Sequence, residues 1–182
     1  MKIILSILLF CSILLADRDG GPYIGLGYGL SEYSDAGVYK ELNKDDSAAS
    51  LYYGGAYINK YFSVELASVR FNYANSYDAV NDSDEEKYIY FDALTVSTLV
   101  HYAFFDDILD FYAKCGVGEI SANVLSDKGF TMVYGTGIGL RFTKSLSMKV
   151  AYETYMFDYE KTDATIKEMR INLVYTAIEY QF

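Results

Sequence analysis

The last eleven residues of the chain, 172–182, alternate strictly between apolar and polar positions. One face carries Val174, Thr176, Ile178, Tyr180 and Phe182, and the other carries Ala177, Glu179 and Gln181. Side chains on a β-strand point to opposite faces with a period of two residues. The segment is therefore predicted to be a strand with one apolar face, closed by an aromatic residue at the carboxyl terminus.

The same alternation recurs along the chain and predicts eight strands. Long polar loops and short turns alternate between them, so the first and last strands end on the same side. In one predicted strand, 61–73, the alternation blurs at Val69 and Phe71, where we expect a β-bulge. The predicted strands are 22–33, 50–58, 61–73, 88–104, 109–123, 130–142, 146–158 and 168–182.

Two kinds of closed barrel fit this pattern. A soluble, lipocalin-like barrel buries the apolar face inside, whereas a membrane barrel turns that face to lipid. Glycine favours the membrane barrel, because glycines on a water-facing strand weaken it without a packing gain, whereas inside a narrow barrel they make room. These glycines alternate with apolar residues in two strands: Gly25, Gly27, Gly29, Gly135, Gly137 and Gly139.

Charged residues fall on the same face as the glycines. In a membrane barrel they would meet across the lumen, three acids with three bases, and could pair there. Charges in a confined lumen must be paired or hydrated, because an uncompensated buried charge is costly. The alternative is a solvated outer face with scattered charges. The predicted lumen charges are Glu65, Lys114, Arg141, Lys149, Glu153 and Glu179.

The first sixteen residues read as a secretory signal peptide, with one Lys followed by an apolar run that closes at Ala16. Residues 17–182 would then form a single barrel domain. Lipid modification at Cys11 is a weaker alternative. After cleavage Cys115 would be the only cysteine, so no disulfide within the chain is expected. No later run is long and apolar enough for a transmembrane helix.

The chain resembles the OmpA/OmpX-type small outer-membrane barrels of Gram-negative bacteria, including the opacity-like surface proteins. The segments Gly54–Tyr57 and Val64–Leu66, with the inward Glu65, are similar to the second hairpin of that family. The terminal Tyr180 and Phe182 resemble the signal by which the outer-membrane assembly machinery recognises such proteins. The resemblance implies an eight-stranded antiparallel up-and-down barrel in the bacterial outer membrane, with periplasmic termini. No peptidoglycan-binding domain follows Phe182, so a role in tethering the cell wall is not implied.

Candidate chemistry is sparse. The only histidine, His101, is followed by Tyr102 and Ala103, so it lacks the His-x-Ser spacing of barrel lipid A deacylases, and we expect it to form hydrogen bonds in the lumen. Cys115 has no second ligand nearby, which argues against a zinc site. The acidic run Asp82–Glu86 could bind Ca²⁺ weakly, but a solvated loop tip is the simpler interpretation. We expect neither a cofactor nor a metal.

The formal net charge of −10 disfavours nucleic acid as a partner, because phosphate binding needs clustered Lys and Arg. The sequence favours a monomeric, non-enzymatic barrel in outer-membrane lipid, with its lumen plugged by charged residues. Four surface loops would serve envelope structure or adhesion, and loops 34–49 and 74–87 are the candidates for an extracellular partner. The alternatives are a small pore for ions or hydrophobic compounds, a soluble lipocalin-like ligand binder and a lipid-modifying barrel enzyme.

Overall fold

A computed structural model describes residues 20–34, 41–42, 47–77, 86–105, 107–122, 128–160 and 166–182. Nine strands lie in this part of the chain, and β2 has only two residues. Among the described residues, no helix is long and apolar enough to cross a membrane. The strands are β1 (Gly21–Ser34), β2 (Glu41–Leu42), β3 (Ser47–Asn59), β4 (Phe62–Tyr77), β5 (Glu86–Phe104), β6 (Leu109–Ala122), β7 (Lys128–Arg141), β8 (Leu146–Glu160) and β9 (Ile166–Gln181).

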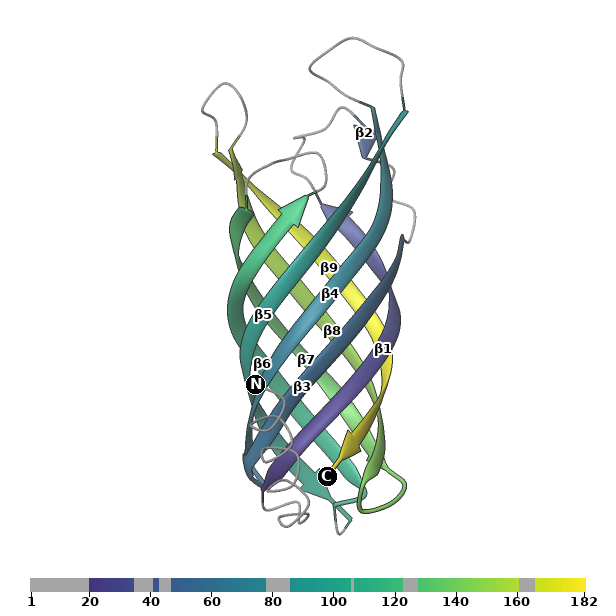
Figure 1. The fold of residues 1–182 in the computed structure, drawn as a ribbon, viewed down its shortest axis with the longest axis vertical. Coiled ribbons are helices and arrows are strands. Elements are labelled where there is room, and N and C mark those ends of the chain that lie inside the picture. The colour runs from purple at the N-terminus through teal and green to yellow at the C-terminus, as the bar shows by residue number, and fades with distance from the viewer. Residues whose placement is uncertain are drawn as a thin grey trace, which may run out of the picture.

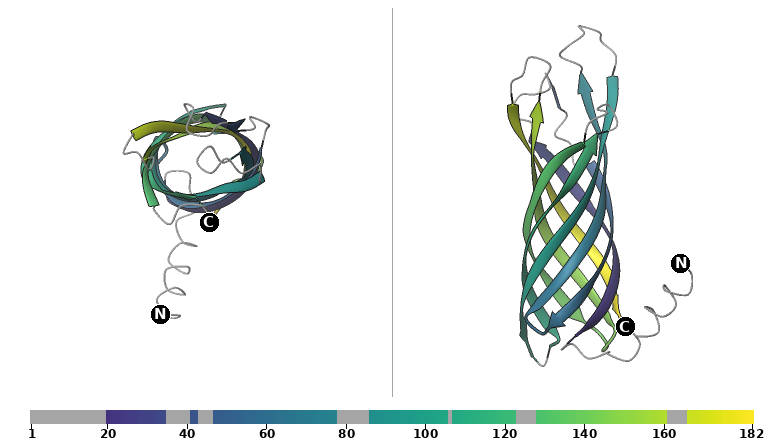
Figure 2. Two further views of the ribbon diagram at one scale, coloured as in Figure 1. Left: turned by 90° about the horizontal axis from the view of Figure 1, so that it is seen from above. Right: turned by 60° about the vertical axis from the view of Figure 1, so that its left-hand side comes forward.

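The eight long strands form one closed antiparallel barrel, as predicted (Figure 1). Each of these strands pairs with the next long strand in the sequence, and β1 pairs with β9. The ring therefore has no free edge among these strands. Figure 2 shows the closed ring from above and the tilt of the strands from the side. Three short connections and Phe182 lie at one end of the barrel, here called the turn end; the opposite end is the loop end.

Several strands extend further toward the loop end than the alternation predicted. The last strand begins at Ile166, two residues before its predicted start at 168, because β8 and β9 stay paired as far as Glu160 and Ile166. The predicted irregularity in β4 lies just beyond the predicted place, between Phe71 and Ala74. Val69 and Phe71 keep the inward parity and are fully buried, so the blurred alternation there reflects an apolar inner lining.

Glycines allow the bulky inward side chains to fit into the narrow lumen. Tyr23 lies opposite Gly55, Tyr53 opposite Gly25, and Tyr112 opposite Gly137. A Cβ atom built on Gly25 would lie 2.6 Å from Cε1 of Tyr53, too close for two carbon atoms. Each of these cross-strand pairs therefore places a tyrosine ring over a residue without a side chain, as the inward assignment of the glycines requires.

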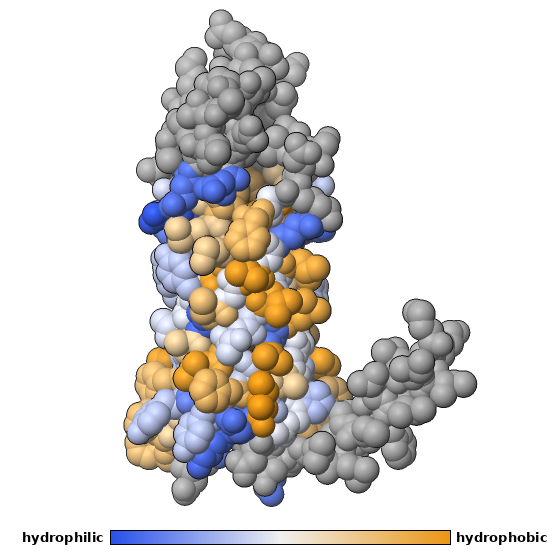
Figure 3. All heavy atoms as spheres, turned by 90° about the vertical axis from the view of Figure 1, so that its left-hand side faces the viewer, coloured by the Kyte–Doolittle hydropathy of each residue, from blue (hydrophilic) through white to orange (hydrophobic). Residues whose placement is uncertain are grey.

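The outward face is apolar along the middle and turn-end parts of the barrel. Leu26, Tyr52, Val96 and Ile178 are more than half exposed there. In Figure 3, orange apolar residues cover much of the wall, and blue residues gather at the loop end of the described surface, with further blue atoms near the turn end. Large apolar side chains thus face outward on the strands, the reverse of a soluble barrel.

Candidate functional site

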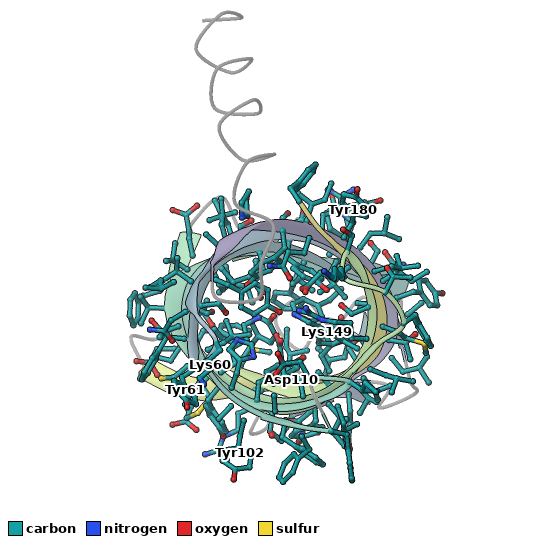
Figure 4. The ribbon with its side chains drawn as sticks, turned by 90° about the horizontal axis from the view of Figure 1, so that it is seen from below. Lys60, Tyr61, Tyr102, Asp110, Lys149 and Tyr180 are labelled. Atoms are coloured by element: carbon teal, nitrogen blue, oxygen red, sulfur yellow. The ribbon has the colours of Figure 1, made fainter. Side chains whose placement is uncertain are left out.

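The barrel interior holds the buried polar side chains of the described residues, and it divides into two layers. The half near the loop end is lined mainly by aromatic and aliphatic residues, with ring contacts between Tyr33 and Phe91 and between Phe71 and Tyr155, at centroid distances of 5.8 and 5.2 Å. The half near the turn end holds charged residues, hydroxyl groups and tyrosines. Figure 4, seen from the turn end, shows Lys149 and Asp110 inside the ring of strands.

Lys114 of β6 lies between two carboxylates. Its Nζ atom is 3.0 Å from Oε1 of Glu65 on β4 and 2.8 Å from Oε1 of Glu153 on β8. Tyr155 and Tyr175 each donate a hydroxyl hydrogen bond of 2.7 Å to Glu153. At most 4% of each of the three charged side chains is exposed, so the ionic and hydroxyl contacts together compensate for the loss of hydration.

Lys149 of β8 lies in a cage of aromatic rings and forms an ion pair with Glu179 of β9. Its Nζ atom is 5.0 Å from the ring centroid of Tyr23 and 5.3 Å from those of Tyr53 and Tyr112. Cation–π attraction of this kind strengthens when water is excluded. Tyr57 donates a hydrogen bond of 3.0 Å to the other oxygen of Glu179.

Nearer the turn end, a serine, a histidine and an aspartate from three adjacent strands form a chain. Ser63 Oγ lies 2.8 Å from Nε2 of His101, and Nδ1 of His101 lies 2.8 Å from Oδ2 of Asp110. These distances match those between a nucleophile, its base and an orienting acid. Ser63 is completely buried, however, and its Oγ also accepts a hydrogen bond of 3.4 Å from Tyr23. A substrate carbonyl would have no access to this hydroxyl in the folded barrel.

Tyr23 connects the clusters. Its hydroxyl donates to Ser63 and, at 3.3 Å, to Glu65, while its ring faces Lys149. A continuous polar network therefore runs from Asp110 near the turn end to Tyr155, where the apolar layer begins. The network can hold buried charges in place and tie distant strands together.

The structure places the predicted lumen charges as follows. Glu65, Lys114, Glu153, Lys149 and Glu179 are buried inside the barrel and lie in the two clusters just described. Arg141 lies nearer the turn end, where its Nη2 donates a hydrogen bond of 3.0 Å to Gln181 instead of pairing with a carboxylate of either cluster. Tyr180 and Phe182 lie together at the turn end, with ring centroids 5.1 Å apart.

Sequence reasoning missed the tyrosine cage and the partners of His101. The cage could have been suspected, since Tyr23, Tyr53 and Tyr112 share inward parity with the glycines. The serine–histidine–aspartate chain gave no such sign, because Ser63 and Asp110 lie 38 positions before and 9 positions after His101. The hydrogen bonds of His101 with Ser63 and Asp110 do lie inside the barrel, as expected for this histidine.

Some predicted features lie outside the described residues. These are the signal peptide 1–16, most of loops 34–49 and 74–87, and the acidic residues Asp82–Glu85. Within the described part of the chain, no group of three or more His, Cys, Asp or Glu residues could hold a metal ion.

Comparison with known proteins identifies the class. The chain matches the outer membrane protein beta-barrel domain family over residues 3–178, and it belongs to that family. It is therefore a transmembrane β-barrel of the bacterial outer membrane, and the outward apolar face lies against lipid. This excludes the soluble lipocalin-like alternative. Among curated proteins, none matches the sequence.

Solved structures of small outer-membrane barrels share the fold. Neisserial surface protein A is similar, with 12% identity and a TM-score of 0.67, covering 90% of this chain and 99% of that one. OprG from Pseudomonas aeruginosa has 11% identity and a TM-score of 0.56, covering 92% and 98%. Ail, the attachment invasion locus protein of Yersinia pestis, has 14% identity and a TM-score of 0.53, covering 88% and 97%.

Proposed function

We propose that this protein is a non-enzymatic, monomeric outer-membrane barrel that displays its loops at the cell surface and conducts no solutes. One observation carries the proposal: buried side chains fill the interior in both layers. Lys114 and Lys149 with their carboxylates occupy one half, and aromatic residues such as Phe71 and Phe91 occupy the other. A solute would have to displace paired charges and then a packed apolar layer.

The burial of Ser63 supports the non-enzymatic part of the proposal. Nucleophilic catalysis needs a reacting atom within about 3 Å of both the nucleophile and an oxyanion donor. The fully buried Ser63 leaves no space for such an atom. The chain Ser63–His101–Asp110 serves to satisfy the hydrogen bonds of a buried carboxylate and imidazole.

The exposed loops then carry the function, as on other rigid scaffolds. Loop 74–87 contains five acidic residues and a single Lys, and loop 34–49 contains four acidic residues and two Lys. Ail has been crystallised with the heparin analogue sucrose octasulfate. The acidic loops of this chain repel such a polyanion, so we infer a different kind of surface contact, with a basic or cation-bridged partner.

In this proposal the turn end, with Tyr180 and Phe182, faces the periplasm, and the assembly machinery recognises these two aromatic residues at the last strand. The loop end then faces the outside.

An epitope experiment tests display and orientation together. The same epitope is inserted in loop 74–87 or, as the matched control, in the turn 143–145, and intact cells are labelled with antibody. Labelling of the loop insertion alone supports the proposal, and labelling of the turn insertion alone overturns it. Purified protein in planar bilayers gives the second test: steady channels would favour the pore alternative.

A further inference from the structure

The turn between β5 and β6 presents an unusual phenylalanine. Phe105 has a φ of 53°, in the left-handed region that bulky L-residues rarely adopt. Its side chain is 75% exposed, more than any other large hydrophobic side chain in the described part of the chain. Two unfavourable features thus coincide in one residue: a strained backbone and an exposed apolar ring.

The backbone holds this ring in place. The amide of Ile108 donates a hydrogen bond of 3.2 Å to the carbonyl of Phe105, which closes the turn. The amide of Arg141, at the end of β7, donates a hydrogen bond of 2.8 Å to the carbonyl of Ile108. The turn is therefore tied to the barrel wall, and Phe105 projects from a fixed base.

The ring of Phe105 continues the lipid-facing wall. It contacts Phe104, at a centroid distance of 6.4 Å. Phe104 in turn packs edge-to-face on Tyr102 and Phe111, at 4.6 and 5.5 Å. Tyr102 and Phe111 are outward residues of β5 and β6, so an unbroken aromatic cluster runs from the wall onto the turn.

The aromatic residues at the turn end lie mainly on one side of the barrel. The exposed large hydrophobic residues nearest the turn end are aliphatic on β1, β3 and β8, where they are Ile24, Ile58 and Leu146. Figure 4 shows Tyr102 and Tyr180 on opposite outer sides of the ring. Among the described residues, the aromatic side chains at the turn end on the β9 side are Tyr180 and Phe182. The β4–β7 side has Tyr61, Phe62, Tyr102, Phe104, Phe105, Phe111 and Phe142.

We propose that the β5–β6 turn is a one-sided membrane anchor: Phe105, with Phe104 and Ile108, lies in the headgroup region of the bilayer at the turn end. Aromatic rings favour this region, and the patch is continuous with the wall that already faces lipid. The other two turns carry exposed lysines, Lys60 and Lys144, which suit the polar side of the same boundary. The occupant is therefore lipid, and the proposal holds whichever leaflet contains the turn end.

The chain has no tryptophan, so a single introduced Trp reports on its own position. Phe105→Trp, Phe111→Trp as the lipid reference and Lys144→Trp as the water reference are folded into phosphatidylethanolamine/phosphatidylglycerol vesicles. Each is quenched by lipid brominated near the headgroup and, separately, by aqueous iodide. We expect Phe105→Trp to have blue-shifted emission and to lose most of it to brominated lipid, as Phe111→Trp does. Red-shifted emission quenched by iodide, as in Lys144→Trp, would overturn the anchor and leave the patch free for a protein partner.

A second variant separates anchoring from backbone strain. Phe105→Asn removes the ring and places at a positive φ a residue that tolerates it. If the ring binds lipid, the variant unfolds from vesicles at a lower urea concentration than the wild type, despite the relieved strain. If Phe105 is only a strained exposed residue, the variant unfolds at a higher urea concentration, and the proposal fails. Heat-modifiable migration on gels checks that all variants are folded.

Discussion

At the scale of single residues, Lys114 is the most sensitive position of the interior, because two carboxylates depend on it. Lys114→Met leaves Glu65 and Glu153 buried without their counter-ion, and removing one partner from such a group costs about 3–5 kcal/mol. Arg70→Met is the matched control, since the Arg70–Asp92 pair is largely exposed and is worth at most about 1 kcal/mol. Urea unfolding in vesicles measures both. Equal losses of unfolding free energy in the two variants would show that the interior charges are hydrated and that Glu65 and Glu153 do not depend on Lys114.

Ser63 gives a second test at this scale. Because the hydroxyl is completely buried, we expect a fluorophosphonate probe to leave Ser63 unmodified in the folded barrel, although His101 lies within 2.8 Å. Mass spectrometry of the labelled protein provides the measurement. Labelling that disappears in both Ser63→Ala and His101→Gln would contradict the non-enzymatic proposal and reopen a hydrolytic function.

At the scale of the strand, β7 contains glycines with different surroundings on one face. A Cβ atom on Gly135 would lie 2.8 Å from Cγ and 3.0 Å from Cα of Glu153, and it would also meet the backbone oxygen of Tyr152. On Gly139 the nearest atom would be 3.6 Å away, an ordinary contact. We therefore expect Gly135→Ala to cost about 1–3 kcal/mol by overpacking, and Gly139→Ala to be neutral or stabilising. Equal effects in an unfolding titration would refute this account of the glycines.

The strands also show what local sequence patterns can predict. Alternation was sufficient to assign the eight strands, because the period of two is a property of each strand alone. The inward face was assigned from the glycines and charges that share it. It failed where both faces are apolar, as at Val69 and Phe71, and it began the last strand two residues late, because the β8–β9 pairing, which alternation does not report, extends to Ile166. Which groups meet across the lumen depends on closure and stagger, so the alternation did not indicate that Arg141 would donate a hydrogen bond to Gln181.

At the scale of the whole molecule, the two interior layers lie in series along the barrel axis. The charged layer near the turn end and the aromatic layer near the loop end each contain buried, packed side chains. Barriers in series must all be opened before ions pass. A variant that weakens one layer should therefore remain closed, although it loses stability by creating a cavity.

Planar-bilayer conductance tests this arrangement with three variants. Phe71→Ala with Phe91→Ala opens the aromatic layer, and Glu65→Ala, Lys114→Ala and Glu153→Ala with Lys149→Ala and Glu179→Ala remove both charged clusters without leaving one of their ions unpaired. We expect neither set alone to produce steady channels and the combination of all seven substitutions to produce them, because only then does a hydrated path extend through both layers. Steady conductance from the aromatic set alone would mean that the charged layer is already permeable. The protein would then be a pore closed only at its loop end, and the rings of Phe71 and Phe91 would be its gate.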